Sequence, residues 1–328
     1  MMAKDVNYKK QPCGGIGCFV DDDGSCNGIA TNGTGTTHRT DTIVQSLWTK
    51  PILQGKRSEA LRLERMRDTL FLMALSLAYA HRSGYRVHMH TDSVGAELLQ
   101  GFGYDKLLTT LDAIPDSVPT ELFAAGKFYA MRAEGAVGKV HVDVDVLLRK
   151  AGVLDGFYRN RSVDAVCQME EDMAIVNHDD KIRHMHVLGY PASTRPDWRG
   201  SMNTGVVGFN NAVLAAKYMR NYFDALEMYS REKFDAYRAE LSAAGQPKPN
   251  LHFDFVLEQI ALSRMSVGYN VLTLVPTHDP SIVAKKIGYC HLQGSSKWDS
   301  NTKTEIKSNL RKMDEKLYYR ARLAGTKV

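Results

Sequence analysis

The 328-residue sequence lacks any apolar run long enough to cross a lipid bilayer as a helix. Its longest apolar helical segment, residues 70–80, is much shorter than the roughly 18 residues that such a helix needs. The first five residues, Met-Met-Ala-Lys-Asp, also lack the apolar core of a secretory signal. We therefore expect a protein without a transmembrane segment, located in the cytoplasm.

Cysteine is scarce, and its five positions form no regular pattern: Cys13, Cys18, Cys26, Cys167 and Cys290. An odd number without paired spacing argues against a disulfide framework and favours a reducing compartment. The first three lie close together, but their spacing fits no zinc finger or ribbon, so we interpret them as ordinary thiols. The stretch 24–37, rich in Gly, Thr and Asn, predicts a long loop.

Neither sign of charge dominates the sequence. Its 42 Lys and Arg against 37 Asp and Glu leave a net charge of +5. Such a mild excess suits anionic ligands without requiring nucleic acid or an acidic membrane surface. Hydrophobic residues make up 44% and charged residues 24%, which is ordinary for a globular chain able to bury a sizeable core.

The pattern of helices and strands predicts an α/β fold. Residues 58–83 have helical periodicity, Gly84 ends the helix, and residues 85–90 alternate like a strand. The helical stretch 122–136 is likewise followed by the strand-like run 141–148. This alternation predicts a mainly parallel sheet with helices on both faces, and a ligand site beyond the carboxyl ends of the strands.

Further along, strands are expected at 165–169 and 182–190, and a strongly helical segment at 212–244. No internal repeat or clear linker interrupts the chain. We therefore expect one domain over residues 1–300, with a helical elaboration near 212–250, followed by a basic C-terminal helix or tail at 301–328.

Two acids stand within the apolar run His141 to Leu148, at Asp143 and Asp145. If this run is one buried strand, both carboxylates point to the same side, where they would repel each other unless a cation compensated them. Carboxylate oxygens suit Mg²⁺ or Mn²⁺. The alternative, a pair of solvated turn carboxylates, fits less well with apolar neighbours.

A second segment, His291 to Trp298, reads His-x-x-Gly-x-x-Lys-Trp. With the Asp-x-Asp pair it resembles glycosyltransferase family eight, the glycogenin and lipopolysaccharide galactosyltransferase group, which has the type-A nucleotide-sugar fold. That family's motif reads His-x-x-Gly-x-x-Lys-Pro-Trp, and the Pro is missing here. The resemblance implies that Asp143, Asp145 and His291 hold a metal, for which the imidazole favours Mn²⁺ over Mg²⁺.

The same resemblance implies roles for further residues. Lys297 and Gly294 would contact the donor diphosphate, and Lys127 lies where the family keeps a basic residue that reaches the donor. Asn203, in the strand-like run 203–210, would line the sugar. The pair Glu258-Gln259 resembles the family's Asp-Gln, with Gln259 at the reactive face or Glu258 acting there as a carboxylate.

The first 120 residues are similar to an uncharacterised group of presumed type-A transferases. The likeness rests on Trp-Thr-Lys-Pro at 48–51, on a strand ending in Thr91-Asp92, and on Gly-Lys-Phe-Tyr-Ala at 126–130. Thr91 and Asp92 are accordingly expected to contact the nucleoside of the donor. The alternative for each of these positions is an ordinary structural role.

These features predict a metal-dependent glycosyltransferase that moves a hexose from a nucleotide diphosphate sugar, with UDP as the expected nucleotide. The resemblance implies retention of the anomeric configuration, while the acceptor could be a saccharide or a modified DNA base. A nucleotidyltransferase acting on sugar phosphates is an alternative, although it would be expected to lack the loop 291–297. A non-catalytic carbohydrate-binding protein is another. A glycoside hydrolase is disfavoured because no suitable carboxylate pair is evident.

Eight basic residues follow the last motif: Lys303, Lys307, Arg311, Lys312, Lys316, Arg320, Arg322 and Lys327. Their spacing predicts a solvated amphipathic helix over about 302–323. The same residues, with two tyrosines among them, could instead form an arm that guides a polyanionic acceptor such as nucleic acid.

Overall fold

The computed structural model describes residues 41–55, 57–171, 200–228, 231–243, 254, 256–275, 283–292, 294 and 296–328. Three sequence predictions lie outside these residues: the loop at 24–37, the strand at 182–190, and the character of the three N-terminal cysteines. Within the described part of the chain, none of the helices combines the length and the hydropathy needed to traverse a bilayer.

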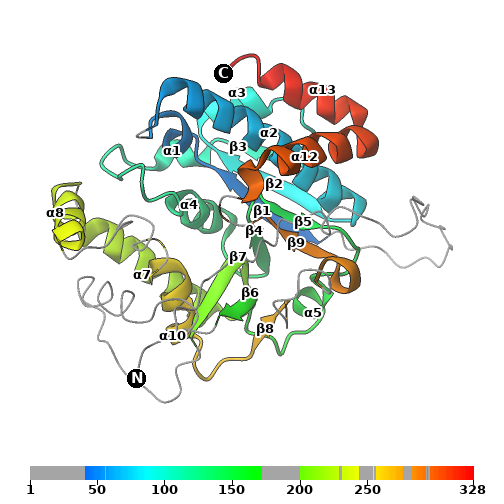
Figure 1. Ribbon diagram of the computed structural model, residues 1–328. Coiled ribbons are helices and arrows are strands. Elements are labelled where there is room, and N and C mark those ends of the chain that lie inside the picture. The colour runs from blue at the N-terminus through cyan, green and yellow to red at the C-terminus, as the bar shows by residue number, and fades with distance from the viewer. Residues whose placement is uncertain are drawn as a thin grey trace, which may run out of the picture.

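A seven-stranded mixed sheet lies at the centre of the molecule, in the order β3-β2-β1-β4-β7-β6-β8 (Figure 1). Its strands are β1 (Thr42–Leu47), β2 (Arg86–Thr91), β3 (Lys106–Leu108), β4 (Lys139–Val142), β6 (Ala165–Glu171), β7 (Ser201–Phe209) and β8 (Val271–Thr273). β7 runs antiparallel to both of its neighbours, and the other neighbouring pairs are parallel. A separate antiparallel pair joins β5 (Val146–Leu148) to β9 (Tyr289–His291).

Helices cover both faces of this sheet. The longer ones are α2 (Glu59–Arg82), α4 (Ala125–Glu134), α7 (Ala212–Met228), α8 (Arg231–Ala243), α12 (Ser300–Met313) and α13 (Glu315–Ala324). The shorter α-helices are α1 (Lys50–Leu53), α3 (Ser93–Leu99), α5 (Asp155–Tyr158) and α10 (Ala261–Met265). Short 3₁₀ segments are η2 (Thr110–Ala113) and η5 (Ser296–Trp298), and π-helical segments are η3 (Val256–Ile260) and η4 (Val283–Ile287).

Alternation along the strands divides the core into two apolar layers. Val166 and Val206 pack with α2, α12 and α13 on one face, whereas Cys167 and Val207 pack with α4, α7 and η3 on the other. This division follows from the two-residue period of a strand, which sends successive side chains to opposite faces. The predicted fold class, α/β with a mainly parallel mixed sheet flanked by helices, is confirmed.

The apolar run 141–148 is not the single strand that was predicted. β4 ends at Val142, residues 143–145 form a turn closed by the Val146 N–H donating to the Asp143 carbonyl at 3.0 Å, and β5 begins at Val146. β4 lies in the main sheet, whereas β5 leaves it to pair with β9. Both short strands are buried, so the apolar composition alone could not distinguish two strands from one.

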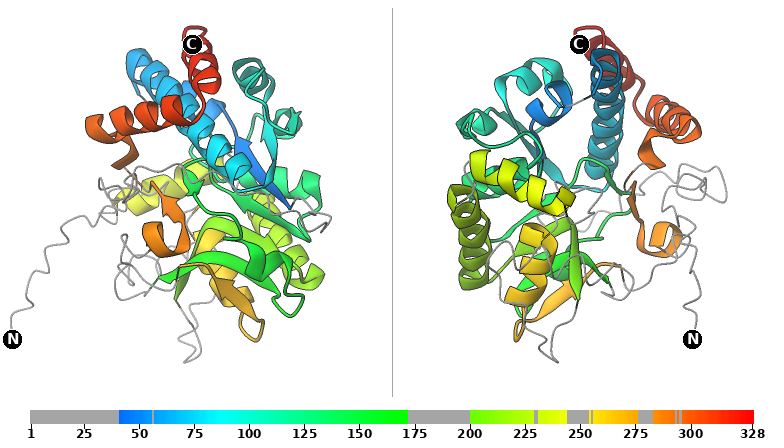
Figure 2. Two further views of the ribbon diagram at one scale, coloured as in Figure 1. Left: turned by 90° about the vertical axis from the view of Figure 1, so that its right-hand side faces the viewer. Right: turned by 60° about the vertical axis from the view of Figure 1, so that its left-hand side comes forward.

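The C-terminal segment forms two helices instead of the single helix expected over 302–323. Asp314 adopts an extended backbone with φ −149° and accepts a hydrogen bond from the Leu317 N–H at 2.8 Å, so it ends α12 and caps α13. Both helices pack against α2 (Figure 2). Their inward faces, through Leu310 and Ala321 among others, belong to the core.

Candidate functional site

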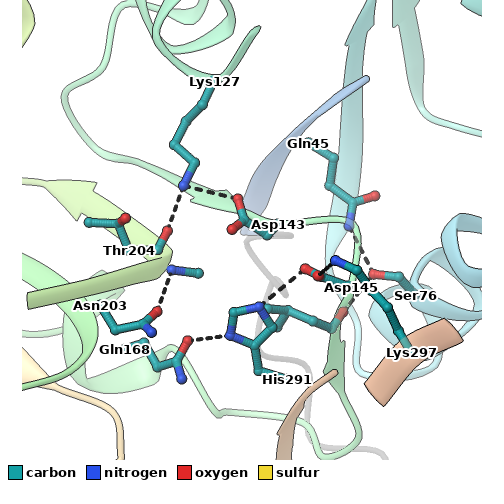
Figure 3. A network of polar contacts seen from close by, with 12 residues as sticks. Gln45, Ser76, Lys127, Asp143, Asp145, Gln168, Asn203, Thr204, His291 and Lys297 are labelled. Atoms are coloured by element: carbon teal, nitrogen blue, oxygen red, sulfur yellow. Dashed lines mark hydrogen bonds and ion pairs between the residues drawn. The ribbon is translucent and has the colours of Figure 1, made fainter. Parts of the chain in front are cut away.

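The two predicted metal-binding acids lie in the turn between β4 and β5, at the carboxyl end of β4. His291, the last residue of β9, reaches the same point because β9 pairs with β5. Ligand atoms of Asp143, Asp145 and His291 lie within 4.8 Å of one another. Figure 3 shows the three side chains pointing toward one another. The carboxylates therefore converge from a partly exposed turn and not from one face of a strand.

Two lysines stand against these carboxylates from opposite sides (Figure 3). Lys297 contacts the Asp145 Oδ2 atom. Lys127, in the first turn of α4, donates to the Thr204 carbonyl at 2.8 Å, lies 3.0 Å from Asp143 Oδ1, and also pairs with Glu258. The two lysine ammonium groups thus compensate the negative charges of the two carboxylates, as a divalent cation would.

The two acids of the turn respond differently to their surroundings. Burial raises the pKa of Asp143 to about 6, because the charge of Asp145 adds to the effect of desolvation and Lys127 only partly offsets it. Burial acts in the same direction on Asp145, but Lys297 and His291 outweigh it and hold the pKa of Asp145 well below its usual range. A cation beside Asp145 is therefore part of what stabilises this cluster.

The orientation of His291 is set by Gln168 of β6. The Gln168 Oε1 atom lies 2.7 Å from His291 Nδ1 and accepts a hydrogen bond from the Tyr289 hydroxyl at 2.8 Å. A carbonyl oxygen only accepts, so Nδ1 carries a hydrogen and the Nε2 atom of a neutral ring presents its lone pair. That Nε2 faces Asp145 Oδ1 at 3.2 Å, where a lone pair is stable only with a proton or a cation between the two atoms. This donor set fits a bound divalent metal.

Glycine at position 205 allows β7 to approach His291. A Cβ atom there would lie 2.5 Å from Gln168 Oε1 and 2.6 Å from His291 Cε1. The Gly205 carbonyl also accepts a hydrogen bond from the Asp143 N–H at 2.8 Å. Gly205 therefore contacts the site on two sides, at its imidazole and at its turn.

The residues predicted to line the donor sugar lie on and beside β7. The Asn203 side chain donates to Glu171 at 2.9 Å and accepts from the Gly205 N–H at 3.0 Å. Gln259, in η3, accepts from the Ser201 hydroxyl at 3.2 Å and is partly exposed. Glu258 is buried and ion-paired with Lys127. The pair Glu258-Gln259 therefore presents only its amide member toward solvent.

The two residues predicted to contact the nucleoside have structural partners. Asp92 accepts hydrogen bonds from the Thr49 N–H and hydroxyl, both at 2.8 Å, and caps α3 through the Gly95 N–H. The Thr91 hydroxyl donates to the Leu47 carbonyl at 2.7 Å. Asp92 thus ties the segment after β1 to α3, and Thr91 ties the end of β2 to the end of β1. Their contact with a nucleoside stays a prediction.

The segment that carries Lys297 is anchored on α2. The Arg65 guanidinium lies over the Trp298 ring, with its Cζ atom 4.1 Å from the ring centroid. Gly294, in the same segment, is exposed and has φ +62°, which glycine adopts without strain. The stack explains the aromatic residue that follows Lys297.

Sequence reasoning missed Gln168 and Arg65 as neighbours of the site. An amide inside the apolar strand 165–169 was the available signal for Gln168, because a buried amide needs a hydrogen-bonding partner. Arg65 had no such signal, since it is one of several charged residues on the outer face of a helix.

Comparison with known proteins gives one family and several distant structures. Residues 42–323 match a protein family described as a family of unknown function (DUF6734). No curated protein sequence matches the chain. A structure of the galactosyltransferase LgtC in complex with donor and acceptor sugar analogs is 10% identical, with a TM-score of 0.38, and the match covers 82% of this chain and 95% of that chain. The bifunctional glycosyltransferase WbbM is 11% identical, with a TM-score of 0.41 and coverage of 88% and 52%. Likenesses as distant as these do not bear on individual residues of the site.

Proposed function

This chain belongs to a family of unknown function (DUF6734), and we propose that it is a metal-dependent glycosyltransferase. It would move a hexose from a nucleotide diphosphate sugar, with UDP as the expected nucleotide, to an acceptor that the site does not identify. The observation that carries this proposal is the convergence of Asp143, Asp145 and His291 beside Lys297. Two carboxylates, an oriented imidazole and a lysine form a donor set suited to a metal–diphosphate complex.

In this proposal Asp143, Asp145 and His291 hold the metal. A bound Mn²⁺ or Mg²⁺ would supply positive charge to the diphosphate as it leaves the sugar. Lys297, which contacts Asp145, would turn its ammonium group to the same diphosphate. Gly294 would let the backbone of its segment approach the phosphates closely.

Residues around β7 would position the sugar. Asn203 and Gln259 offer amide groups that can orient sugar hydroxyls. Lys127 would reach the donor from α4, while its buried pair with Glu258 holds that carboxylate away from solvent. Gln259 is therefore the residue that we assign to the reactive face, with retention of the anomeric configuration as the expected outcome. Thr91 and Asp92 would lie toward the nucleoside.

A donor-hydrolysis screen across nucleotide sugars, with and without Mn²⁺, tests the proposal. The unaltered protein should release the nucleoside diphosphate only with the metal. Asp145→Asn should retain less than about a tenth of that activity, a barrier increase above about 1.4 kcal/mol. Asp116→Asn is the matched control, because the Asp116 side chain is 93% exposed and pairs with Lys50, away from the acid cluster.

Other outcomes would overturn the proposal or its details. Turnover of a sugar 1-phosphate with UTP would indicate a nucleotidyltransferase instead. Sugar binding without any metal-dependent binding of a nucleotide would indicate a carbohydrate-binding protein. Once an acceptor is found, NMR of the first-formed glycoside checks retention, and an inverted anomer would remove Gln259 from the reactive face.

A further inference from the structure

Arg65 of α2 is a partly exposed cation with one buried hydrogen-bonding atom that is unused. Its Nη1 atom is inaccessible to solvent and has no hydrogen-bond partner among the described residues. The guanidinium is held in place by its stack on the Trp298 ring. A buried donor without an acceptor costs free energy, so its place beside a candidate binding site points to a ligand.

The acids nearest to Arg65 along the helix are occupied by other cations. Lys303 of α12 lies 2.6 Å from the Glu64 carboxylate and 2.7 Å from that of Asp68. Lys307 lies 3.7 Å from Asp68 as well. Among the ion pairs of the described residues, none includes Arg65. Burial lowers the pKa of Arg65 and the charge of Arg57 lowers it further, whereas the charges of Glu64 and Asp68 act in the opposite direction.

Trp298 connects this guanidinium to the candidate site. Trp298 directly follows Lys297, whose Nζ atom lies 5.5 Å from the centroid of the same ring. Lys297 in turn contacts Asp145 of the acid cluster. Two cations from distant parts of the chain, Arg65 and Lys297, therefore lie against one aromatic ring at the margin of the site.

We propose that Arg65 is a phosphate-binding residue of this site and that it holds, together with Lys297, the diphosphate end of the donor. A planar guanidinium can donate two parallel hydrogen bonds to phosphate oxygens, which the single ammonium group of Lys297 cannot do. Arg65 of α2 would thus bind the same diphosphate as Lys297, although the two residues lie in different segments of the chain. This inference rests on the proposed function, because it assumes that the site takes a diphosphate.

Calorimetric titration with Mn²⁺ and inorganic pyrophosphate tests the role of Arg65 without knowledge of the nucleotide. Arg65→Gln should weaken pyrophosphate binding about tenfold or more, as expected for loss of charge-assisted hydrogen bonds. Arg82→Gln is the matched control, since Arg82 is an exposed arginine in the last turn of the same helix. It should bind like the unaltered protein.

A double-mutant cycle separates direct binding from mere support of the loop. If Arg65 only positions Lys297 through Trp298, Arg65→Gln should have no further effect in a Lys297→Ala background. Direct phosphate binding instead predicts a further loss of about tenfold in that background. An absent further loss would overturn the proposal and leave Arg65 as a packing residue.

The remaining outcomes are also decisive. Arg65→Lys, which keeps the charge, should bind pyrophosphate more tightly than Arg65→Gln and less tightly than the unaltered protein, and it replaces the glutamine variant if that variant fails to fold. If either variant binds pyrophosphate as tightly as the unaltered protein, the role of Arg65 is refuted, but the proposed function is not. Absence of pyrophosphate binding by the unaltered protein, with and without Mn²⁺, would refute the proposed function as well.

Discussion

Replacing Gly205 by alanine should weaken metal binding through a residue that is not itself a ligand. The new Cβ atom would lie 2.5 Å from Gln168 Oε1 and 2.6 Å from His291 Cε1, which is much closer than van der Waals contact. The strand backbone at 205 tolerates alanine, because its φ lies outside the left-handed region. The imidazole or the amide must therefore move, and the hydrogen bond that orients His291 is lost.

The expected loss of metal affinity can be estimated from the hydrogen bond between Gln168 and His291. Loss of a hydrogen bond to a metal-ligating histidine typically lowers metal affinity about 10- to 100-fold. At a metal concentration of about 100 times the original dissociation constant, the metal stabilises the fold by about 2.7 kcal/mol. That stabilisation should fall to about 1.4 kcal/mol for a tenfold loss of affinity and to about 0.4 kcal/mol for a hundredfold loss.

Urea unfolding with and without Mn²⁺, together with calorimetric Mn²⁺ titration, measures both quantities. The comparison must be made within each variant, because overpacking alone costs about 1–3 kcal/mol in the metal-free protein. Gly156→Ala is the matched control, since its Cβ would meet only the end of the Leu272 side chain, at 3.0 Å. Unchanged Mn²⁺ affinity in Gly205→Ala would refute the reasoning that Gln168 orients the His291 imidazole for metal binding.

The other expectations concern Asp254, Lys297 and the exposed cations of α12 and α13. Burial raises the pKa of Asp254 to about 8 from an ordinary 3.8. Its contribution to stability should therefore fall by about 1.4 kcal/mol per pH unit between about pH 4 and 8, and Asp254→Asn should remove that slope in urea unfolding at pH 5 and 9. Lys297→Ala should lower kcat more than it raises the donor KM, because its charge matters most as the leaving group forms, whereas a change in KM alone would contradict this role. If α12 and α13 guide a polyanionic acceptor, glutamine at Lys312, Lys316 and Arg320 should flatten the salt dependence of acceptor binding, and an unchanged slope would leave them as packing helices.

The regular part of the fold could be predicted where the sequence carries a clear period. α2 and β2 were recognised from a helical pattern that ends at Gly84 and an alternating pattern that follows it. β1 was not predicted, because Thr42–Leu47 is buried on both faces and shows no alternation of apolar and polar residues. The same ambiguity affected residues 141–148, where two short buried strands have the composition of one long strand.

The sequence by itself determined the alternation of helices and strands and the two chemical groups of the site, the acid pair at 143 and 145 and the segment 291–298. Only the tertiary structure decided how these groups meet. It placed the acids in a turn between two strands, set His291 against Gln168, and stacked Arg65 on Trp298. The reason is that these contacts join residues more than a hundred positions apart, and no local period records which side chains the packing of a sheet brings together.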